Sequence, residues 1–360
     1  MKNRLLTIGP VQMYDSTLKV RSEQVPYFRN QEFSELMFEN ERLLKKLQYA
    51  DDDSKVIFLT ASGTGAMEAT VMNLFDENDK VLVISGGTFG QRFEKICETH
   101  KIPFDSISLR FDEELTRDHF QNRSPDEYTG ILVNIDETYT GQLYDIEIIK
   151  DFKDRGNMLL VVDAISSFLC DEYNMSKNHI DATIVSSQKG LCLSPGMSFV
   201  TLSRDAIRKI DSIDTKTIYF DFKDYINNMK RGQTPFTPAV GVCYELNDIL
   251  KKIDSIGVES HIAEIERRAS LFRKMCNDIK DMISIPKFKL SNALTPILFK
   301  EDCASDVIQY IREKENIIVN PVGGDLGKRS ARISHIGNIN DEDYEKVIRC
   351  IKEKVCERYV

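Results

Sequence analysis

The sequence predicts an α/β fold: an open, mostly parallel sheet sandwiched by helices, followed by a smaller C-terminal α+β domain. Two observations support this prediction. Continuous apolar runs alternate with segments of helical periodicity along the first two thirds of the chain, which is typical of strand–helix–strand units. Several of these runs end directly in glycine, aspartate or lysine, and parallel sheets bind ligands at the carboxyl ends of their strands.

The elements of the first domain follow one another in a regular order. Apolar residues at helical spacing predict a first helix at 31–50. Buried strands are predicted at 55–63, 79–87, 128–138, 157–167, 181–190 and 197–203. Helices between them are predicted at 65–75, 89–100 and about 145–155. Because helices separate most of these strands, we expect neighbouring strands to run parallel.

The pattern changes after about residue 245. A long charged helix is predicted at 258–282, and it is followed by strands at 295–300 and around "IIVN" and "ARISHIG", and by helices at 304–315 and 341–359. We therefore predict a large domain at 16–245 and a small domain that combines 246–360 with the N-terminal segment 1–15. No Gly/Ser-rich linker separates the two, so we expect a tight interface that carries the active site.

Composition argues against several classes of protein. With 48 basic and 57 acidic residues, the formal net charge is -9, which is unsuited to binding nucleic acid. No apolar run approaches the roughly 20 residues needed to cross a bilayer, and the N-terminus does not resemble a secretory signal, so no membrane association is expected. The eight cysteines include no CxxC pair and no metal-ligand spacing, which predicts reduced, mostly buried thiols in a cytoplasmic protein.

Two glycine-rich turns follow predicted strands. In "TASGTGAME" (60–68), hydroxyl residues and glycines precede a helix, whose N-terminal N–H groups could bind an anion. The same residues could form a simple tight turn. In "SGGTFGQRF" (85–93), Phe89 could belong to the core, or its ring could face a flat ligand at the strand end.

Two charged residues end buried strands. Asp163 closes "LLVVD" and could cap a turn, or it could pair with a cationic nitrogen of a heteroaromatic cofactor, because a buried carboxylate needs a positive partner. Lys189 follows "ATIVSSQ" and could be a surface lysine, or a desolvated amine of lowered pKa that attacks a carbonyl to form a Schiff base. An anion-binding turn, an aromatic face, a strand-end carboxylate and a strand-end lysine together predict a site for pyridoxal phosphate.

The order of short motifs resembles the class V aminotransferases of the fold-type I pyridoxal-phosphate enzymes. Within that family it is most similar to the alanine–glyoxylate, serine–pyruvate and 2-aminoethylphosphonate–pyruvate transaminases. The motifs cover nearly the whole chain: "TIGPV", "EFSEL", "SGTGAMEA", "GGTFGQRF", "ETYTGQL", "VDAISS", "SSQKGL", "TPFTPAV" and "RISHIG". Each motif is weak alone, and the ordered set is specific.

The resemblance implies a role for each matching residue. Lys189 would bond the cofactor and carry protons, Asp163 would hold the pyridine nitrogen protonated, and Phe89 would stack on the ring. The phosphate would be bound by Ser62, Gly63, Thr64 and Gln188.

The resemblance also implies an obligate homodimer with shared active sites, in which the partner subunit completes the phosphate site through Thr237 and Thr234. Arg332 matches the arginine that binds the substrate carboxylate, a task suited to a planar guanidinium. Near the ring oxygen, Tyr139 replaces a small hydroxyl residue, so either Thr138 or the Tyr139 phenol would serve there.

Some cations and histidines fall outside these roles. Lys328 and Arg329 precede Arg332, and they either favour a dianionic substrate or lie in a solvated turn. We expect His335 to be a structural hydrogen-bonding residue. The histidines that we expect at the surface are His100, His119, His179 and His261.

The predicted reaction is transfer of an amino group from a small donor such as alanine or serine to glyoxylate or pyruvate. The alternative donor is 2-aminoethylphosphonate, with pyruvate as its acceptor. A cysteine desulfurase or lyase on the same scaffold would need a cysteine that reaches the cofactor, and neither Cys303 nor Cys192 is well placed for this. A non-catalytic protein of this fold would not need to retain Lys189, Asp163 and the phosphate turn.

Overall fold

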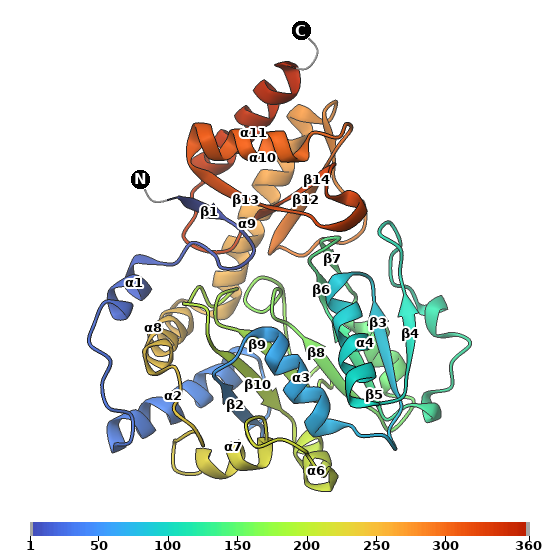
Figure 1. Ribbon diagram of the computed structural model, residues 1–360, viewed down its shortest axis with the longest axis vertical. Helices are drawn as coiled ribbons and strands as arrows, with labels where there is room; N and C mark the ends of the chain where they lie inside the picture. Colours follow the sequence, from blue (N-terminus) through green and yellow to red (C-terminus); the bar gives the residue numbers. More distant parts are fainter. Residues whose placement is uncertain (1–2, 358–360) are drawn as a thin grey trace.

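The computed structural model describes residues 3–357, apart from the side chain of Asp325, and within them a seven-stranded sheet confirms the predicted α/β class (Figure 1). In sheet order the strands are β2 (Lys55–Leu59), β10 (Ser198–Leu202), β9 (Ala182–Ser186), β8 (Leu159–Asp163), β5 (Gly130–Asn134), β3 (Val81–Ser85) and β4 (Phe104–Ser108). Neighbours from β9 to β4 pair in parallel, whereas β10 is antiparallel to both of its neighbours. The carboxyl ends of the parallel strands therefore share one edge of the sheet.

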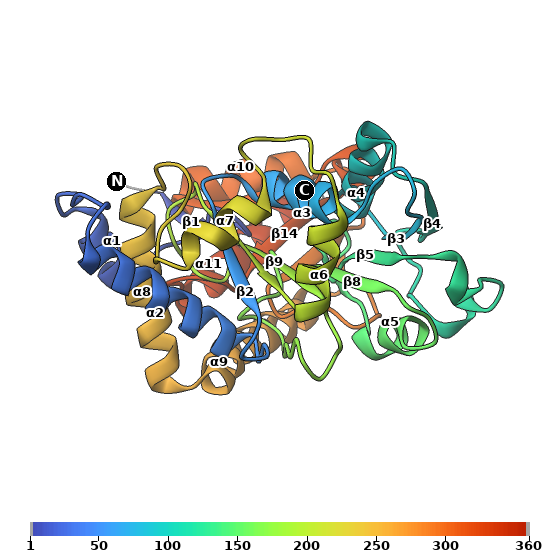
Figure 2. The same cartoon turned by 90° about the horizontal axis from the view of Figure 1, so that it is seen from below.

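Helices cover both faces of this sheet, because its strands are apolar on both sides (Figure 2). One face packs against α3 (Gly63–Leu74), α4 (Thr88–His100), α6 (Arg204–Ser212) and α7 (Phe222–Met229). The other packs against α2 (Gln31–Leu47), α5 (Ile146–Lys153) and α8 (Val240–Ile256). Within β2, Ile57 joins the first core and Phe58 joins the second, as the pleat of a strand requires.

A second sheet of five strands forms the smaller part of the described chain. Its order is β1 (Arg4–Leu6), β13 (Ile317–Pro321), β14 (Ser330–Ser334), β12 (Leu294–Phe299) and β11 (Ile283–Ser284). Its helices are α9 (Val258–Cys276), α10 (Ala304–Glu315) and α11 (Asp341–Cys356). Strand β1 pairs in parallel with β13, with Arg4 opposite Ile317, so the N-terminal strand and the C-terminal part of the chain share one sheet.

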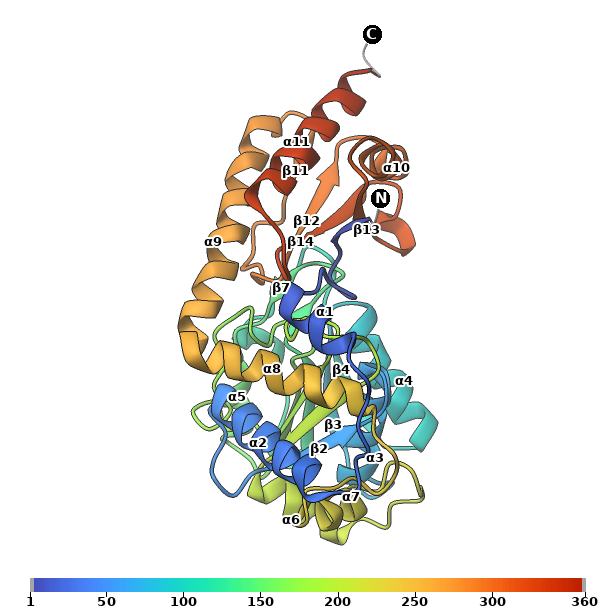
Figure 3. The same cartoon turned by 90° about the vertical axis from the view of Figure 1, so that its left-hand side faces the viewer.

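Helix α9 joins the two parts along one side of the molecule, from the end of α8 to the small sheet (Figure 3). A hairpin of β6 (Asp136–Glu137) and β7 (Gln142–Leu143) also meets the small part. The Leu143 N–H donates to the Lys289 carbonyl at 2.9 Å, and the Ser291 N–H donates to the Gly141 carbonyl at 3.0 Å. These backbone hydrogen bonds fix the hairpin at the junction of the two sheets.

The remaining elements are short. Helix α1 (Asp15–Arg21) leads from the N-terminal segment to α2. Single turns of 3₁₀ helix lie at Arg117–Phe120, Pro125–Glu127, Asn277–Ile279 and Gly324–Leu326. Among the helices within residues 3–357, none combines the length and the apolar character required to span a membrane.

Two histidines, His261 and His335, are buried. His335 is fully buried and forms hydrogen bonds with the Thr295 hydroxyl at 2.8 Å and the Tyr344 hydroxyl at 2.9 Å, as a structural histidine should. The expectation that His261 lies at the surface was wrong. His261 belongs to the buried face of α9 with Val258 and Ile265, and burial lowers its pKa to about 4.

Candidate active site

The carboxyl ends of three neighbouring parallel strands bring the central groups of the site together. Asn134 ends β5 and lies opposite Asp163, which ends β8. Lys189 follows β9, the next strand in the sheet. The sequence separates these residues widely, and the parallel register places them at one edge.

Asp163 is almost completely buried, with 1% of its surface exposed. One carboxylate oxygen accepts a hydrogen bond from the Ile165 N–H at 2.8 Å. Burial raises the pKa of Asp163 to about 6, and the positive charges of Lys189 and Arg92 oppose this rise. At neutral pH the side chain is therefore mainly a carboxylate, available to a cationic ring nitrogen.

Lys189 keeps some accessible surface, but the protein surrounds its amine closely. Desolvation lowers the pKa of the amine to about 8, while the acidic groups of Asp136 and Asp163 oppose this fall. The side chain lies against Gly9, where a Cβ atom would stand 2.7 Å from Cδ and Cε of Lys189. The "TIGPV" segment therefore covers the lysine, and a larger residue at position 9 would displace the lysine side chain.

The predicted phosphate turn forms the N-terminus of α3. The Ser62 hydroxyl accepts a hydrogen bond from the Gly65 N–H at 3.3 Å and caps the helix, and Ser62 and Thr64 are exposed. Gly63 is buried, and a Cβ atom there would stand 2.5 Å from Cδ1 of Ile165. Ile165 lies two residues after Asp163, the last residue of β8. The turn thus presents hydroxyl groups and a helix N-terminus beside Asp163, which fits a phosphate group.

Phe89 is half-buried at the start of α4, and an arginine holds it. The guanidinium carbon of Arg92 lies 4.8 Å from the centre of the Phe89 ring, and Nη1 of Arg92 donates to the Thr64 hydroxyl at 2.7 Å. Arg92 therefore joins the two glycine-rich turns. The sequence analysis missed this residue, although its spacing of three from Phe89 places both on one helical face.

Arg332 lies on β14 and faces the hairpin of the large part. Its Nη1 donates to the Thr138 carbonyl at 3.2 Å and its Nη2 to the Pro321 carbonyl at 2.7 Å. Its Nε is buried and has no hydrogen-bond partner among the described residues. The guanidinium is thus held in place by two hydrogen bonds, with its Nε–H still available for a ligand.

The other residues predicted near the substrate have different surroundings. Thr138 is buried, whereas the Tyr139 ring packs edge-on against Phe111, with 6.0 Å between their centres. Lys328 is exposed, and the exposed Arg329 donates from Nε and Nη2 to the carbonyls of the residues at 299 and 300, at 3.1 and 2.8 Å. Arg329 is therefore engaged at the end of β12.

The remaining predicted phosphate ligands lie in two places. The side-chain carbonyl of Gln188 accepts a hydrogen bond from the Ser186 hydroxyl at 2.8 Å, next to Lys189. Thr234 is buried, and its hydroxyl donates to the Phe236 carbonyl at 2.7 Å. Thr237 is exposed and lines a separate surface hollow. Thr234 therefore has a structural bond within its own chain, and Thr237 faces outward.

The sequence analysis also missed Glu137, which lies beneath the second glycine turn. It is fully buried and accepts hydrogen bonds from the N–H groups of Tyr139 at 3.1 Å and Gly90 at 3.4 Å. Burial raises its pKa to about 7. A Cβ atom at Gly87 would stand 2.6 Å from its carboxyl carbon, so glycine is needed there. Glu137 thereby anchors the start of α4, and with it Phe89. The pair of acids after an apolar strand in "IDET" was the available signal.

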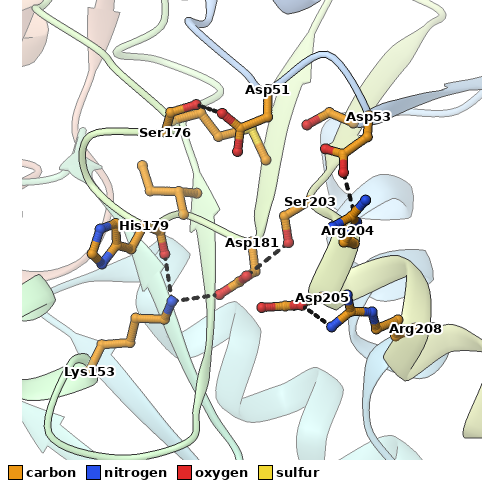
Figure 4. A pocket seen from close by; sticks show the side chains of 13 residues that line it. Asp51, Asp53, Lys153, Ser176, His179, Asp181, Ser203, Arg204, Asp205 and Arg208 are labelled. Atoms are coloured by element: carbon orange, nitrogen blue, oxygen red, sulfur yellow. Dashed lines mark hydrogen bonds and ion pairs between the residues drawn. The ribbon is translucent and has the colours of Figure 1, made fainter.

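A hollow of about 480 Å³ lies at the opposite edge of the sheet (Figure 4). Asp181, at its wall, precedes β9, whereas Lys189 follows the same strand. Its charged side chains pair with one another: Lys153 with Asp181 at 3.1 Å, Arg204 with Asp53 at 2.8 Å and Arg208 with Asp205 at 3.0 Å. Because these charged groups already form ion pairs with one another, fewer of them can bind a ligand than at the carboxyl ends of the strands near Lys189.

Comparison with known proteins agrees with this geometry. The model of the family described as "Aminotransferase class-V" matches residues 12–344. The chain is 27% identical to a protein named soluble hydrogenase 42 kDa subunit from Anabaena cylindrica, over 97% of this chain and 91% of that one. It is 26% identical to the L-aspartate–glyoxylate aminotransferase of Paracoccus denitrificans, over 80% of this chain and 75% of that one.

Solved structures show the same fold. An alanine–glyoxylate aminotransferase from Nostoc sp. superimposes with a TM-score of 0.90 at 22% identity, over 99% of this chain and 96% of that one. The family match extends over most of the chain and includes Asp163, Lys189 and Arg332. The chain belongs to the class V aminotransferases, a family of enzymes that use pyridoxal phosphate.

Proposed function

We propose that this enzyme binds pyridoxal phosphate at Lys189 and transfers an amino group from a small donor of the alanine or serine type to glyoxylate or pyruvate. The observation that carries the proposal is the position of Lys189 and Asp163 at the carboxyl ends of adjacent strands, with the amine desolvated to a pKa of about 8. An amine of this pKa gives up its proton readily near neutral pH, which a lysine in water does not.

The surrounding residues suit the cofactor's parts. Ser62, Thr64 and the N-terminus of α3 would hold the phosphate, and Phe89 would face the ring. When bound, pyridoxal phosphate stabilises the negative charge that develops on the substrate carbon. Asp163 would keep the ring nitrogen protonated, and Lys189 would move the proton at that carbon.

Arg332 would orient the substrate. Its unpartnered Nε can donate to one oxygen of a carboxylate, while the Thr138 and Pro321 carbonyls hold the guanidinium in place. The names of the Paracoccus and Nostoc proteins support glyoxylate as an acceptor. The engagement of Arg329 at β12 removes one extra cation that would have favoured a phosphonate donor.

The geometry disfavours the desulfurase alternative. Burial raises the pKa of the Cys192 thiol to about 12, so it is not a thiolate at neutral pH. Cys303 is buried at the start of α10. Neither thiol is both exposed and ionised, as a nucleophile at this site would have to be.

Absorbance tests this function directly. We expect the purified protein to be yellow, from cofactor linked to Lys189, and to lose that colour when the correct amino donor is added alone. Alanine, serine, aspartate and 2-aminoethylphosphonate are tested singly, and glyoxylate or pyruvate should restore the colour. A protein that stays colourless with added cofactor would contradict the proposal, and sulfide release from cysteine would favour the desulfurase.

We further propose that the active enzyme is a homodimer, with Thr237 of each subunit directed to the other subunit's phosphate site. Thr237 lines a hollow of about 580 Å³ together with Val25, whose exposed fraction is 51%. Tyr27 is 69% exposed and Ile218 is 82% exposed, and contact with a second subunit would remove such side chains from water.

Analytical ultracentrifugation measures the oligomeric state. We expect a mass of twice 41.3 kDa, about 83 kDa, at catalytic concentrations. We also expect Thr237→Ala to weaken cofactor binding by about tenfold, because one hydrogen bond to a phosphate is lost. A fully active species of single-chain mass would contradict the shared site.

A further inference from the structure

Asp136, the first residue of β6, is buried without a partner. Its side chain is 1% exposed, and neither carboxyl oxygen has a hydrogen-bond partner among the described residues. Burying a carboxyl group in this way is costly, and natural proteins rarely leave such a group unsatisfied. This cost suggests that a bound ligand supplies a hydrogen-bond donor or a positive charge to Asp136.

The other buried carboxyls nearby all have donors. The donors are the Ile165 N–H, the Tyr139 N–H and the Ser291 hydroxyl, at 2.8, 3.1 and 2.6 Å from the carboxyls of Asp163, Glu137 and Asp171 respectively. The Ser291 hydroxyl has a single proton, and Asp171 receives it. Asp136 therefore differs from its neighbours in lacking a donor, and not merely in being buried.

The amine of Lys189 is one of three positive charges that act on Asp136, together with Arg273 and Arg332. Among the charges that act on Lys189, Asp136 raises the amine pKa most, ahead of Asp163. Burial raises the pKa of Asp136 well above its ordinary value, as do the like charges of Asp171 and Glu137, while the nearby Ser291 hydroxyl and the charge of Lys189 oppose them. The titrations of the acid and the amine are therefore coupled through their opposite charges.

The other titratable groups around this pair come from every neighbouring element. They are Arg332 on β14, Arg273 on α9, Cys170 after β8 and Tyr144 after β7. Arg332 has a buried Nε without a partner, so an unsatisfied acid and an unsatisfied N–H both lie near Lys189. An α-amino acid carries an ammonium group for the first and a carboxylate for the second.

We propose that Asp136 is a further catalytic residue of this site: it takes a proton from the ammonium group of the incoming amino donor. The inference rests on the proposed function. An N–H bond of the donor breaks, its electron pair stays on nitrogen, and an O–H bond forms on Asp136. The freed amine of Lys189 then takes that proton from Asp136. The protons balance, and no oxidant or reductant is required.

The cofactor-free protein gives the first test. Reductive methylation with formaldehyde and cyanoborohydride is followed at Lys189 by peptide mass spectrometry as a function of pH. Asp136→Asn removes the negative charge, so the midpoint of this profile should fall by about one pH unit. Asp181→Asn is the control, because Asp181 is also buried but lies at the amino end of β9, away from Lys189 and Asp136, and its profile should follow the wild type.

The second test is the reaction of the cofactor-loaded enzyme with the amino donor alone. We expect Asp136→Asn to lower kcat/KM about 100-fold at pH 7, with the loss shrinking as the pH rises and the donor loses its proton in solution. Asp136→Ala should behave alike and should fold, because no hydrogen bond is lost. Asp181→Asn should retain the wild-type pH profile.

Two outcomes separate this inference from the proposed function. If the wild type reacts with no amino donor, the proposed function fails. If the wild type reacts and Asp136→Asn matches it within about threefold across the pH range, in both tests, the role of Asp136 is overturned while the function stands.

Discussion

Lys189→Ala is expected to abolish turnover, with a loss of about 10⁴-fold or more, because the site loses both its attachment point and its proton carrier. The variant should still bind the cofactor non-covalently, since the α3 turn, Phe89 and Asp163 remain. Borohydride reduction followed by intact mass measurement separates the two effects. Wild-type protein should gain the mass of the cofactor, and the variant should not.

Lys189→Arg serves as the comparison, because it keeps the positive charge and removes the reactive amine. We expect it to be as inactive as the alanine variant. A small primary amine added to Lys189→Ala should restore part of the proton transfer. Normal multiple turnover by either variant would refute the assignment of Lys189.

Asp163→Asn is expected to lower kcat about 10³-fold, because asparagine cannot balance a protonated ring nitrogen in a buried site. The asparagine side-chain carbonyl can still accept the Ile165 N–H, so the turn should be kept. The matched control is Asp181→Asn. Asp181 is also buried, but it lies at the amino end of β9 and accepts from the Leu160 N–H at 2.8 Å.

The same substitution should stabilise the cofactor-free protein above about pH 6. The folded-state pKa of Asp163 is raised to about 6, so the unfolded chain binds fewer protons between pH 4 and pH 6 and stability falls as the pH rises through this range. Asparagine removes this cost, which amounts to roughly 1–3 kcal/mol at pH 8. Thermal melts should show a higher Tm for Asp163→Asn at pH 8 and equal values near pH 4. Equal melts at both pH values would show that the carboxylate is not destabilised by burial.

Much of this site was predictable because its residues end strands. Asp163 ends one apolar strand and Lys189 lies three residues after another, and the parallel order of the sheet then places them together. The glycine turns were visible for the same reason. The fold class followed from the alternation of strands and helices, and the seven-stranded sheet confirms it.

The parts that escaped prediction depend on contacts between distant segments. Nothing in the local sequence shows that Gly9 lies against Lys189 or that Arg92 reaches the Thr64 hydroxyl. Strand β4 was missed because its half-exposed, polar residues lack the apolar run of the central strands. Asp136 was passed over because its missing partner is visible only once the surrounding donors have been placed.

The pairing of β1 with β13 has a consequence for how the protein matures during synthesis. Arg4 lies opposite Ile317 and forms an ion pair with Asp343 at 2.8 Å, and the segment that follows β1 covers Lys189 through Gly9. A ribosome makes β1 long before it makes Ile317 and Asp343, because the whole large sheet lies between them in the sequence. Gly9 can therefore settle over Lys189 only after β13 has been made. Until then, the Lys189 side of the site stays open to the cofactor.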